Sequence, residues 1–357
     1  EQSYGLNFYP SYKLADWNKL NFALTLRKDS HTEEEKAISA SESPDIWAVH
    51  DGDKYKTKFI AAEFMTFAVE DEMNFYKKVE VTAGISYDAQ NFTDNKDRIS
   101  DTEYGDAYKV KDDSMIWGTR DSFNPVVAVV WNTIEDLLKL RVAASSKTKF
   151  PTLSAYADIA DVSYDKKIKS ERSYNGNAGF EVTPFGKLLG LRMDYFYTKF
   201  DDKIEEIYSE EFGDDIYTNI DGVVSQGLEA TVSSKIVKVA GVVDISTSLS
   251  YTYTYARLQT DIEDSDINKG DKLESTPAHM FILDLRFDFI SDTSLDIFGQ
   301  YTRNQIKYVM KSAPATTDPY STDYFEAVKL HNPLKLDVKI SQKLFENFDV
   351  FAMCKNV

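Results

Sequence analysis

Two stretches of this chain alternate apolar and polar residues at every second position. In residues 243–255 the odd positions are apolar or aromatic except for Thr247, and the even positions are all small or polar. Residues 281–289 repeat the alternation, with Ile282 as the one exception. Because successive side chains of a β-strand point to opposite faces, both stretches predict strands with one apolar and one polar face.

The length of these alternating runs favours a particular class of β-protein. Strands of soluble sandwiches need only about five or six residues. Segments of about ten alternating residues are typical of outer-membrane barrels, where one face meets lipid and the other meets water. The chain has no apolar run near 18 residues, so no transmembrane helix is expected. The pattern predicts an all-β fold, a transmembrane antiparallel up-and-down β-barrel.

The lengths of the connections give a second argument. About fourteen strands are expected, and seven short turns such as 74–78 and 184–187 interleave with six longer loops such as 29–55 and 93–121. Outer-membrane barrels have short periplasmic turns and long outer loops, so this alternation predicts which end of the barrel faces outward. Fourteen strands could close by themselves, but a part of a larger barrel is at least as well supported.

Composition restricts the possible partners. The 357 residues carry a net charge of -18, which argues against nucleic acid, because a phosphate backbone calls for clustered Lys and Arg. Cations or cationic chelates are better suited. Cys354 is the single cysteine, so no internal disulfide framework is expected, and no signal-peptide pattern opens the chain.

Several short stretches stand at expected strand or loop edges between residues 60 and 357. They are Phe67-Ala68-Val69-Glu70-Asp71-Glu72, Val81-Thr82-Ala83-Gly84-Ile85-Ser86-Tyr87-Asp88, Phe123-Asn124-Pro125, Phe150-Pro151-Thr152-Leu153, Tyr174-Asn175 with Gly179-Phe180, Asn219-Ile220, Gln226-Gly227-Leu228-Glu229-Ala230, Thr276-Pro277-Ala278-His279 and Lys355-Asn356-Val357. In this order and spacing the chain resembles the C-terminal barrel of TonB-dependent outer-membrane receptors.

The resemblance implies a barrel of twenty-two strands that is filled by an N-terminal plug. Residues 1–357 would then form one transmembrane β-barrel domain that holds roughly the last two thirds of that barrel and lacks the plug, the TonB box and the terminal strand. The implied function is active transport across the bacterial outer membrane of a scarce small ligand, such as a ferric siderophore, cobalamin or another metal chelate. The implied partners are that ligand, the TonB-ExbB-ExbD energy-coupling complex and outer-membrane lipid.

Aromatic residues in the expected outer loops are the candidates for ligand binding. Such rings stack on ligands, but they also pack loops together or form a girdle at the membrane interface. For any one residue the packing interpretation is favoured, while some of the set is expected to touch ligand. The candidates are Trp47, Tyr104, Tyr108, Trp117, Tyr156, Tyr164, Tyr320 and Tyr324.

Charged residues give two further predictions. Acidic loops supply oxygen ligands that could hold calcium, although a charge run is more often a solvated face; the calcium candidates are Asp94, Asp97, Asp101, Asp264 and Asp266. Apart from such calcium, no cofactor is expected. Polar residues between the apolar positions would face the lumen and contact the plug; these are Asp244, Asp284, Arg286, Asp288, Asp296 and Asp337.

Catalysis fits the sequence poorly. The four histidines stand in or beside expected loops without the spacing of a metal or nucleophile site, so no enzyme is predicted. Two other functions stay open from the pattern itself. One is a passive, porin-like channel of fourteen strands in which lumen charge selects solutes. The other is a soluble β-rich binding module.

Overall fold

The computed structural model describes residues 1–36, 54–99, 119–135, 137–156, 168–209, 214–220, 222–261, 267–311 and 324–357. Its regular elements are β1 (Gln2–Phe8), β2 (Ser11–Ala15), β3 (Asn18–Lys36), β4 (Lys54–Phe75), β5 (Val79–Ile99), β6 (Thr119–Ile134), β7 (Leu138–Lys149), β8 (Glu171–Val182), the 3-10 helix η1 (Gly186–Leu188), β9 (Leu189–Asp201), β10 (Lys203–Ser209), β11 (Asp214–Ile220), β12 (Val223–Val239), β13 (Val243–Leu258), β14 (His279–Phe289), β15 (Thr293–Arg303), β16 (Ile306–Lys311), β17 (Tyr324–Lys329), β18 (Leu334–Phe345) and β19 (Phe348–Cys354). No helix in this part of the chain is long and apolar enough to cross a membrane.

One antiparallel sheet holds fifteen of these strands. Its order is β1-β3-β4-β5-β6-β7-β8-β9-β12-β13-β14-β15-β18-β19, and β2 pairs with β3 beside β1. β1 and β2 occupy one strand position because Pro10 interrupts them, and proline has no amide hydrogen to donate to the ladder. The sheet therefore has fourteen strand positions, as the sequence predicted.

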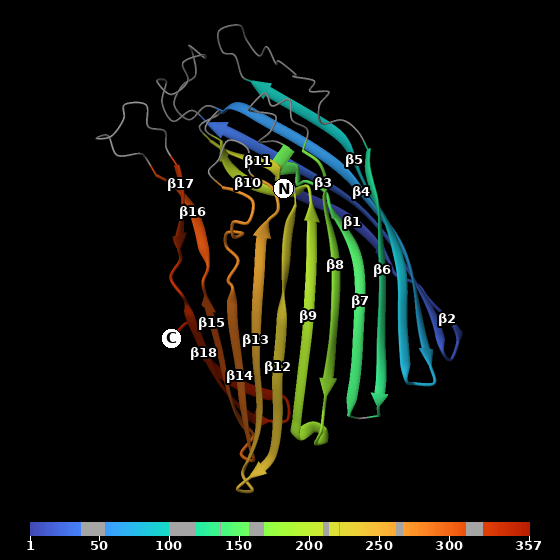
Figure 1. The fold of residues 1–357 in the computed structure, drawn as a ribbon, viewed down its shortest axis with the longest axis vertical. Helices are drawn as coiled ribbons and strands as arrows, with labels where there is room; N and C mark the ends of the chain where they lie inside the picture. Colours follow the sequence, from blue (N-terminus) through green and yellow to red (C-terminus); the bar gives the residue numbers. More distant parts are fainter. Residues whose placement is uncertain are drawn as a thin grey trace.

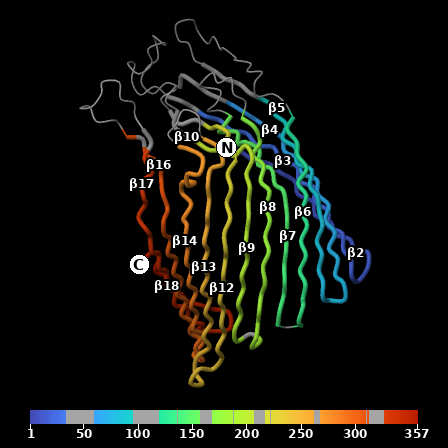
Figure 2. Tube along the Cα trace, in the orientation of Figure 1, coloured from blue at the N-terminus to red at the C-terminus, as the bar shows by residue number. Residues whose placement is uncertain are grey.

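The sheet curves into an open trough (Figures 1 and 2). Its edges are β1 with β2 on one side and β19 on the other, and no pairing among the described strands joins these edges. The self-closed barrel of fourteen strands, one of the two sequence expectations, is therefore not what these strands form.

The two ends of the sheet differ as predicted. Seven tight turns connect strands at one end, and six longer connections follow β3, β5, β7, β9, β13 and β15 at the other end (Figure 1). Left-handed backbone geometry closes several turns, including Tyr76 at φ 53° and Asp292 at φ 57°.

Three strands extend beyond their predicted ends. β3, β4 and β5 span 19, 22 and 21 residues, so the pairing continues past the apolar alternation. Asp94 and Asp97, expected in a loop, lie on β5 opposite Ala61 and Lys58, and their loop assignment was wrong. The reason is that backbone hydrogen bonds hold an antiparallel ladder whatever the side chains are, whereas apolar alternation ends with the lipid.

Two small hairpins also differ from prediction. β10 pairs with β11, and β16 pairs with β17, each as a separate two-stranded sheet. The expected strands 189–207 and 295–308 break at Asp202 and Asn304, which have φ of 51° and 61°. Asp and Asn tolerate this left-handed conformation better than most residues, so a kink could have been suspected there.

The two faces of the sheet have opposite chemistry. Large apolar side chains are exposed on one face, among them Phe67 at 49%, Val142 at 52% and Leu249 at 47%. The other face carries a hollow lined by polar residues of β12 to β15, including Ser248 and Asp284, and is therefore the concave side. The exposed apolar face is thus the convex one, as lipid contact requires.

Aromatic residues mark both limits of the apolar band. Trp17 and Phe75 stack 5.6 Å apart beside the tight turns, and Tyr251 and Phe281 lie 4.7 Å apart toward the long connections. Ten positions separate Val243 from Tyr253 on β13. With about 3.4 Å per residue and a tilt of about 40°, this corresponds to a band about 25 Å tall.

Candidate functional site

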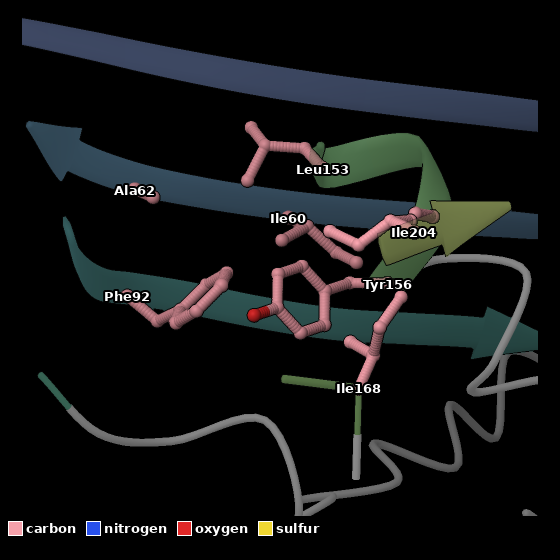
Figure 3. Packing of buried hydrophobic residues seen from close by; sticks show 8 residues of the cluster. Ile60, Ala62, Phe92, Leu153, Tyr156, Ile168 and Ile204 are labelled. Carbon is pink, nitrogen blue, oxygen red and sulfur yellow. The ribbon is translucent and has the colours of Figure 1, made fainter. Parts of the chain in front are cut away.

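Long connections fold inward over the concave face at the mouth of the trough. A single helical turn at residues 153–156, within the β7–β8 connection, packs against Ile60 and Ala62 of β4 and Phe92 of β5 (Figure 3). Ile204 of β10 closes the same cluster from another connection. Buried apolar side chains from three parts of the chain therefore hold the rim together.

Tyr156 is central to this cluster, which we call the rim cluster. Its ring meets the edge of Phe92 at 4.6 Å between centroids, and the Arg120 guanidinium lies 5.4 Å from its centroid. Only 3% of Tyr156 is exposed, and its hydroxyl has no hydrogen-bond partner among the described residues. Burial raises the pKa of the Tyr156 phenol to about 12, against an opposing attraction from Arg120.

A hydrogen bond fixes the start of the inward-folded segment. The side chain of Gln90, fully buried on β5, donates from Nε2 to the carbonyl oxygen of Pro151 at 3.3 Å. Pro151 is itself fully buried. The segment is thus attached to the wall by both a polar contact and the apolar packing of Leu153 and Tyr156.

A second apolar cluster lies on the same face above β12 and β13. Val223, Leu258 and Ile267 are buried there, and Tyr308 of β16 packs against them. The Tyr308 hydroxyl donates to the carbonyl of Lys272 at 3.0 Å. Burial, with the neighbouring Asp271 and Glu274 carboxylates, raises the pKa of Tyr308 to about 12.

An ion network lies deeper on the concave face. Arg141 of β7 reaches across Gly179 of β8 to Asp194 of β9, and its Nε and Nη2 both donate at 2.6 Å. Arg192 donates to the same carboxylate at 2.9 Å, and Glu181 lies 3.6 Å from Arg141. Because Asp194 is only 8% exposed, two cations stabilise a carboxylate that would otherwise be costly to bury.

The predicted lumen residues stand on one face of β13, β14, β15 and β18. Arg286 lies 2.9 Å from Asp288 and 3.4 Å from Asp296, so one cation serves two carboxylates. Asp244 stands opposite Asp288 and accepts a hydrogen bond from the Lys238 amide at 2.7 Å. The last two predicted residues occupy one cross-strand row, which runs Ser248, Asp284, Phe298, Asp337. Their contact with a plug stays a prediction.

Most of the predicted ligand aromatics and part of the acidic set cannot be placed. Trp47, Tyr104, Tyr108, Trp117, Tyr164, Tyr320, Asp101, Asp264 and Asp266 lie outside the described residues. Tyr324 is the first residue of β17 and pairs with Lys311. Among the described residues no group of three or more His, Cys, Asp or Glu is arranged to hold a metal ion, and the calcium prediction stays untested.

Sequence reasoning missed the partners of Tyr156 and the Arg141 network. Phe92 and Arg120 come from strands whose alignment with the inward segment depends on the fold. Arg141 and Asp194 lie 53 residues apart, on strands separated by a third. Gly179, in one of the motif stretches, was the one available signal, because a glycine between two strands leaves room for side chains to meet across it.

The sequence matches the family described as "TonB dependent receptor-like, beta-barrel" over residues 3–357. The chain belongs to the TonB-dependent receptor family. Members of this family are transport receptors and not enzymes, in agreement with the absence of a catalytic pattern in the sequence. No curated protein matches the chain.

Solved TonB-dependent receptors share the fold. The ferric enterobactin receptor PfeA, from Pseudomonas aeruginosa, superposes with a TM-score of 0.60 at 16% identity over 99% of this chain and 48% of its own. The copper transporter OprC gives 0.64 at 14% identity, covering 99% and 50%. The ferripyoverdine receptor of the Pseudomonas aeruginosa outer membrane gives 0.64 at 12% identity, covering 99% and 44%. This chain spans about half the length of these structures.

The unpartnered hydroxyl of Tyr156 leads to a prediction for this receptor barrel. Tyr156→Phe removes a buried polar atom that has no described partner and keeps the ring, so stability should be unchanged or rise by up to about 1 kcal/mol. Tyr156→Ala leaves a cavity and should cost about 3–5 kcal/mol. Thermal unfolding in detergent measures both. Destabilisation by Tyr156→Phe equal to that by Tyr156→Ala would show that the hydroxyl, and not the ring, holds the rim cluster.

The pH dependence of the same pair has a definite sign. Free tyrosine ionises near pH 10, and burial raises the pKa of Tyr156 to about 12. Above pH 10 the unfolded chain therefore releases this proton first, and the contribution to stability is lost between pH 10 and 12. The wild type should lose more stability than Tyr156→Phe over that interval, measured as the difference in melting temperature. Parallel curves would contradict the assignment.

Two glycines of β8 test the ion network. A Cβ on Gly179 would collide with the Asp194 carboxylate and lie 2.5 Å from the Met193 carbonyl oxygen, whereas a Cβ on Gly176 meets nothing within 4 Å. Gly179→Ala should destabilise the barrel by about 2–4 kcal/mol, because it displaces a paired, buried carboxylate. Gly176→Ala is the matched control and should be nearly neutral. Equal melting temperatures for the two variants would rule out the predicted strain.

Proposed function

We propose that this chain is the barrel portion of an outer-membrane TonB-dependent receptor that imports a scarce small metal chelate. The observation that carries the proposal is the division of the sheet into an exposed apolar face and a polar concave face, in a chain that matches the receptor barrel over nearly its whole length. This division suits lipid outside and water inside. A soluble module would leave the convex face as an exposed apolar patch of unusual size.

The open edges of the sheet support a larger barrel. Unpaired strand edges cannot stand in hydrocarbon, because each unsatisfied backbone group costs several kcal/mol. Since the chain spans about half of the related structures, further strands and a plug in the complete protein would close the wall and fill the lumen. The ion pairs of the concave face would then meet the plug.

The mouth of the trough is the proposed ligand entrance. Aromatic and cationic side chains gather there around the rim cluster, and the connections above it contain the untested aromatic candidates. The protein's net charge of -18 favours ligands that carry a cation or a complexed metal. Ferric siderophores, copper complexes and cobalamin all meet this description, and receptors related in fold are named for ferric chelates and copper.

Energy coupling follows from the family. Binding is the only chemistry the barrel performs, and release into the periplasm would depend on TonB, ExbB and ExbD acting on the plug. Outer-loop capture, plug displacement and coupling are parts of one cycle, in which the β-sheet is the rigid wall.

Uptake assays test this function. The full-length protein is produced in a Gram-negative host without its own receptors, and uptake of radiolabelled ferric enterobactin, ferric hydroxamate, copper and cyanocobalamin is compared with and without functional TonB. Saturable uptake of one compound, falling at least about tenfold without TonB, is expected.

A matched measurement excludes the passive alternative. The same purified protein is placed in planar bilayers, where a closed, plugged receptor should show no steady open channel. A stable conductance, together with solute flux that is independent of TonB for every compound, would replace the receptor assignment with a porin-like channel.

A further inference from the structure

Three basic residues stand side by side in one cross-strand row near the long connections. Lys199 of β9 is paired with Val224 of β12, Val224 with Arg257 of β13, and Arg257 with Lys272 in the segment before β14. Paired residues of an antiparallel sheet project to the same face. With strands about 4.8 Å apart, Lys199 and Lys272 lie about 14 Å apart along this basic row.

The basic row lies on the convex face. Two residues further down the strands, the next row contains Tyr197 and Tyr255, which are 39% and 41% exposed. The row after that contains Tyr195, Tyr253 and the pair of His279 with Arg303. The basic row therefore follows directly on the aromatic limit of the apolar band, on the side away from the hydrocarbon.

The side chains are disposed as cations at a lipid boundary. The Arg257 guanidinium lies 4.3 Å from the Tyr255 ring centroid, so its stem covers an aromatic surface while its charge stays at the edge of the band. The side chain of Lys199 is 46% exposed. Arg303, one row lower, is also exposed.

Nearby acids do not cancel this charge. Asp201 lies 2.7 Å from Lys199. Asp271 accepts from the Asn268 amide at 2.8 Å, and Glu274 accepts from the Tyr308 amide at 3.1 Å. Four cations thus face one directly paired carboxylate, in a protein whose net charge is -18.

We propose that the basic row binds the phosphate groups of a phosphorylated lipid in the outer leaflet. Lys and Arg at headgroup level attract anionic lipid, and a guanidinium also donates two parallel hydrogen bonds to phosphate. The row is continuous with the lipid-facing surface and wide enough to meet more than one phosphate group. The proposal rests on the proposed function for its placement of the convex face in the outer membrane.

Arg172 of β8 is close to this row but has a different role. Its guanidinium donates to the Ser146 hydroxyl at 3.0 Å and to the Phe123 carbonyl at 3.1 Å. These bonds join β8 to β6 and β7, so Arg172 is kept unchanged in the test.

The test compares two sets of variants of the full-length protein. Lys199→Gln, Arg257→Gln and Lys272→Gln are combined to remove the basic row. Lys139→Gln and Lys335→Gln are combined as a control, because both are exposed cations on the concave-face rows of β7 and β18. Native mass spectrometry of detergent-purified protein measures the affinity for bisphosphorylated lipid A, for its dephosphorylated form and for inorganic phosphate.

The wild type should bind the bisphosphorylated lipid at least about tenfold more tightly than the dephosphorylated form, and removal of the basic row should abolish that preference. The control should keep it within about twofold, and a Lys199→Arg, Lys272→Arg variant should keep it too. Each of three results would overturn the proposal. These are preference retained without the basic row, equal loss in the control, or inorganic phosphate displacing the lipid at equal concentration.

Failure of this proposal can be told apart from failure of the proposed function. The binding assay needs neither a transported ligand nor TonB, and the uptake assay can be run on the same variants. A barrel that transports normally but shows no lipid preference would refute the basic row alone. Loss of folding is recognised by the melting temperature and is bypassed by the arginine variant.

Discussion

The backbone of a sheet in hydrocarbon must find all its hydrogen bonds within the sheet, and the rest of this structure depends on that constraint. It explains why fourteen strand positions pair in a continuous antiparallel order, with only short turns at one end. It also explains why β3, β4 and β5 continue to pair beyond the apolar band, since backbone pairing costs nothing extra once it is established. The edges at β1 and β19 are where the constraint is still unmet within the described residues.

A sheet paired in this way can differ freely on its two faces. The convex face is apolar between two aromatic limits, and its chemistry changes to cations at the basic row. The concave face carries ion pairs in its depth and apolar clusters at the mouth, where inward-folded connections are held by Tyr156 and Tyr308. Function of a receptor wall follows from this arrangement: a rigid boundary, a polar interior and an entrance built from connections that contact one another.

The sequence predicted the wall well and its rim poorly. Alternation in residues 243–255 is a local property, so strand, face and turn polarity could all be inferred from it. The small hairpins and the rim cluster could not, because Ile204 and Phe92 meet only after the strands have been aligned. The ion pair of Arg141 with Asp194 depends in the same way on Gly179 standing between them. The family resemblance suggested the function, but it placed no ligand residue.

Spin-label accessibility along β13 tests the central claim most directly. Single cysteines are placed at each position from 244 to 255 of the full-length protein, with Cys354 replaced by serine, and the labelled protein is reconstituted in bilayers. Collision with oxygen dissolved in the lipid should rise and fall with a period of two, with maxima at odd positions such as Leu249 and minima at even positions such as Ser248. Maxima at the even positions, or no alternation, would contradict the account.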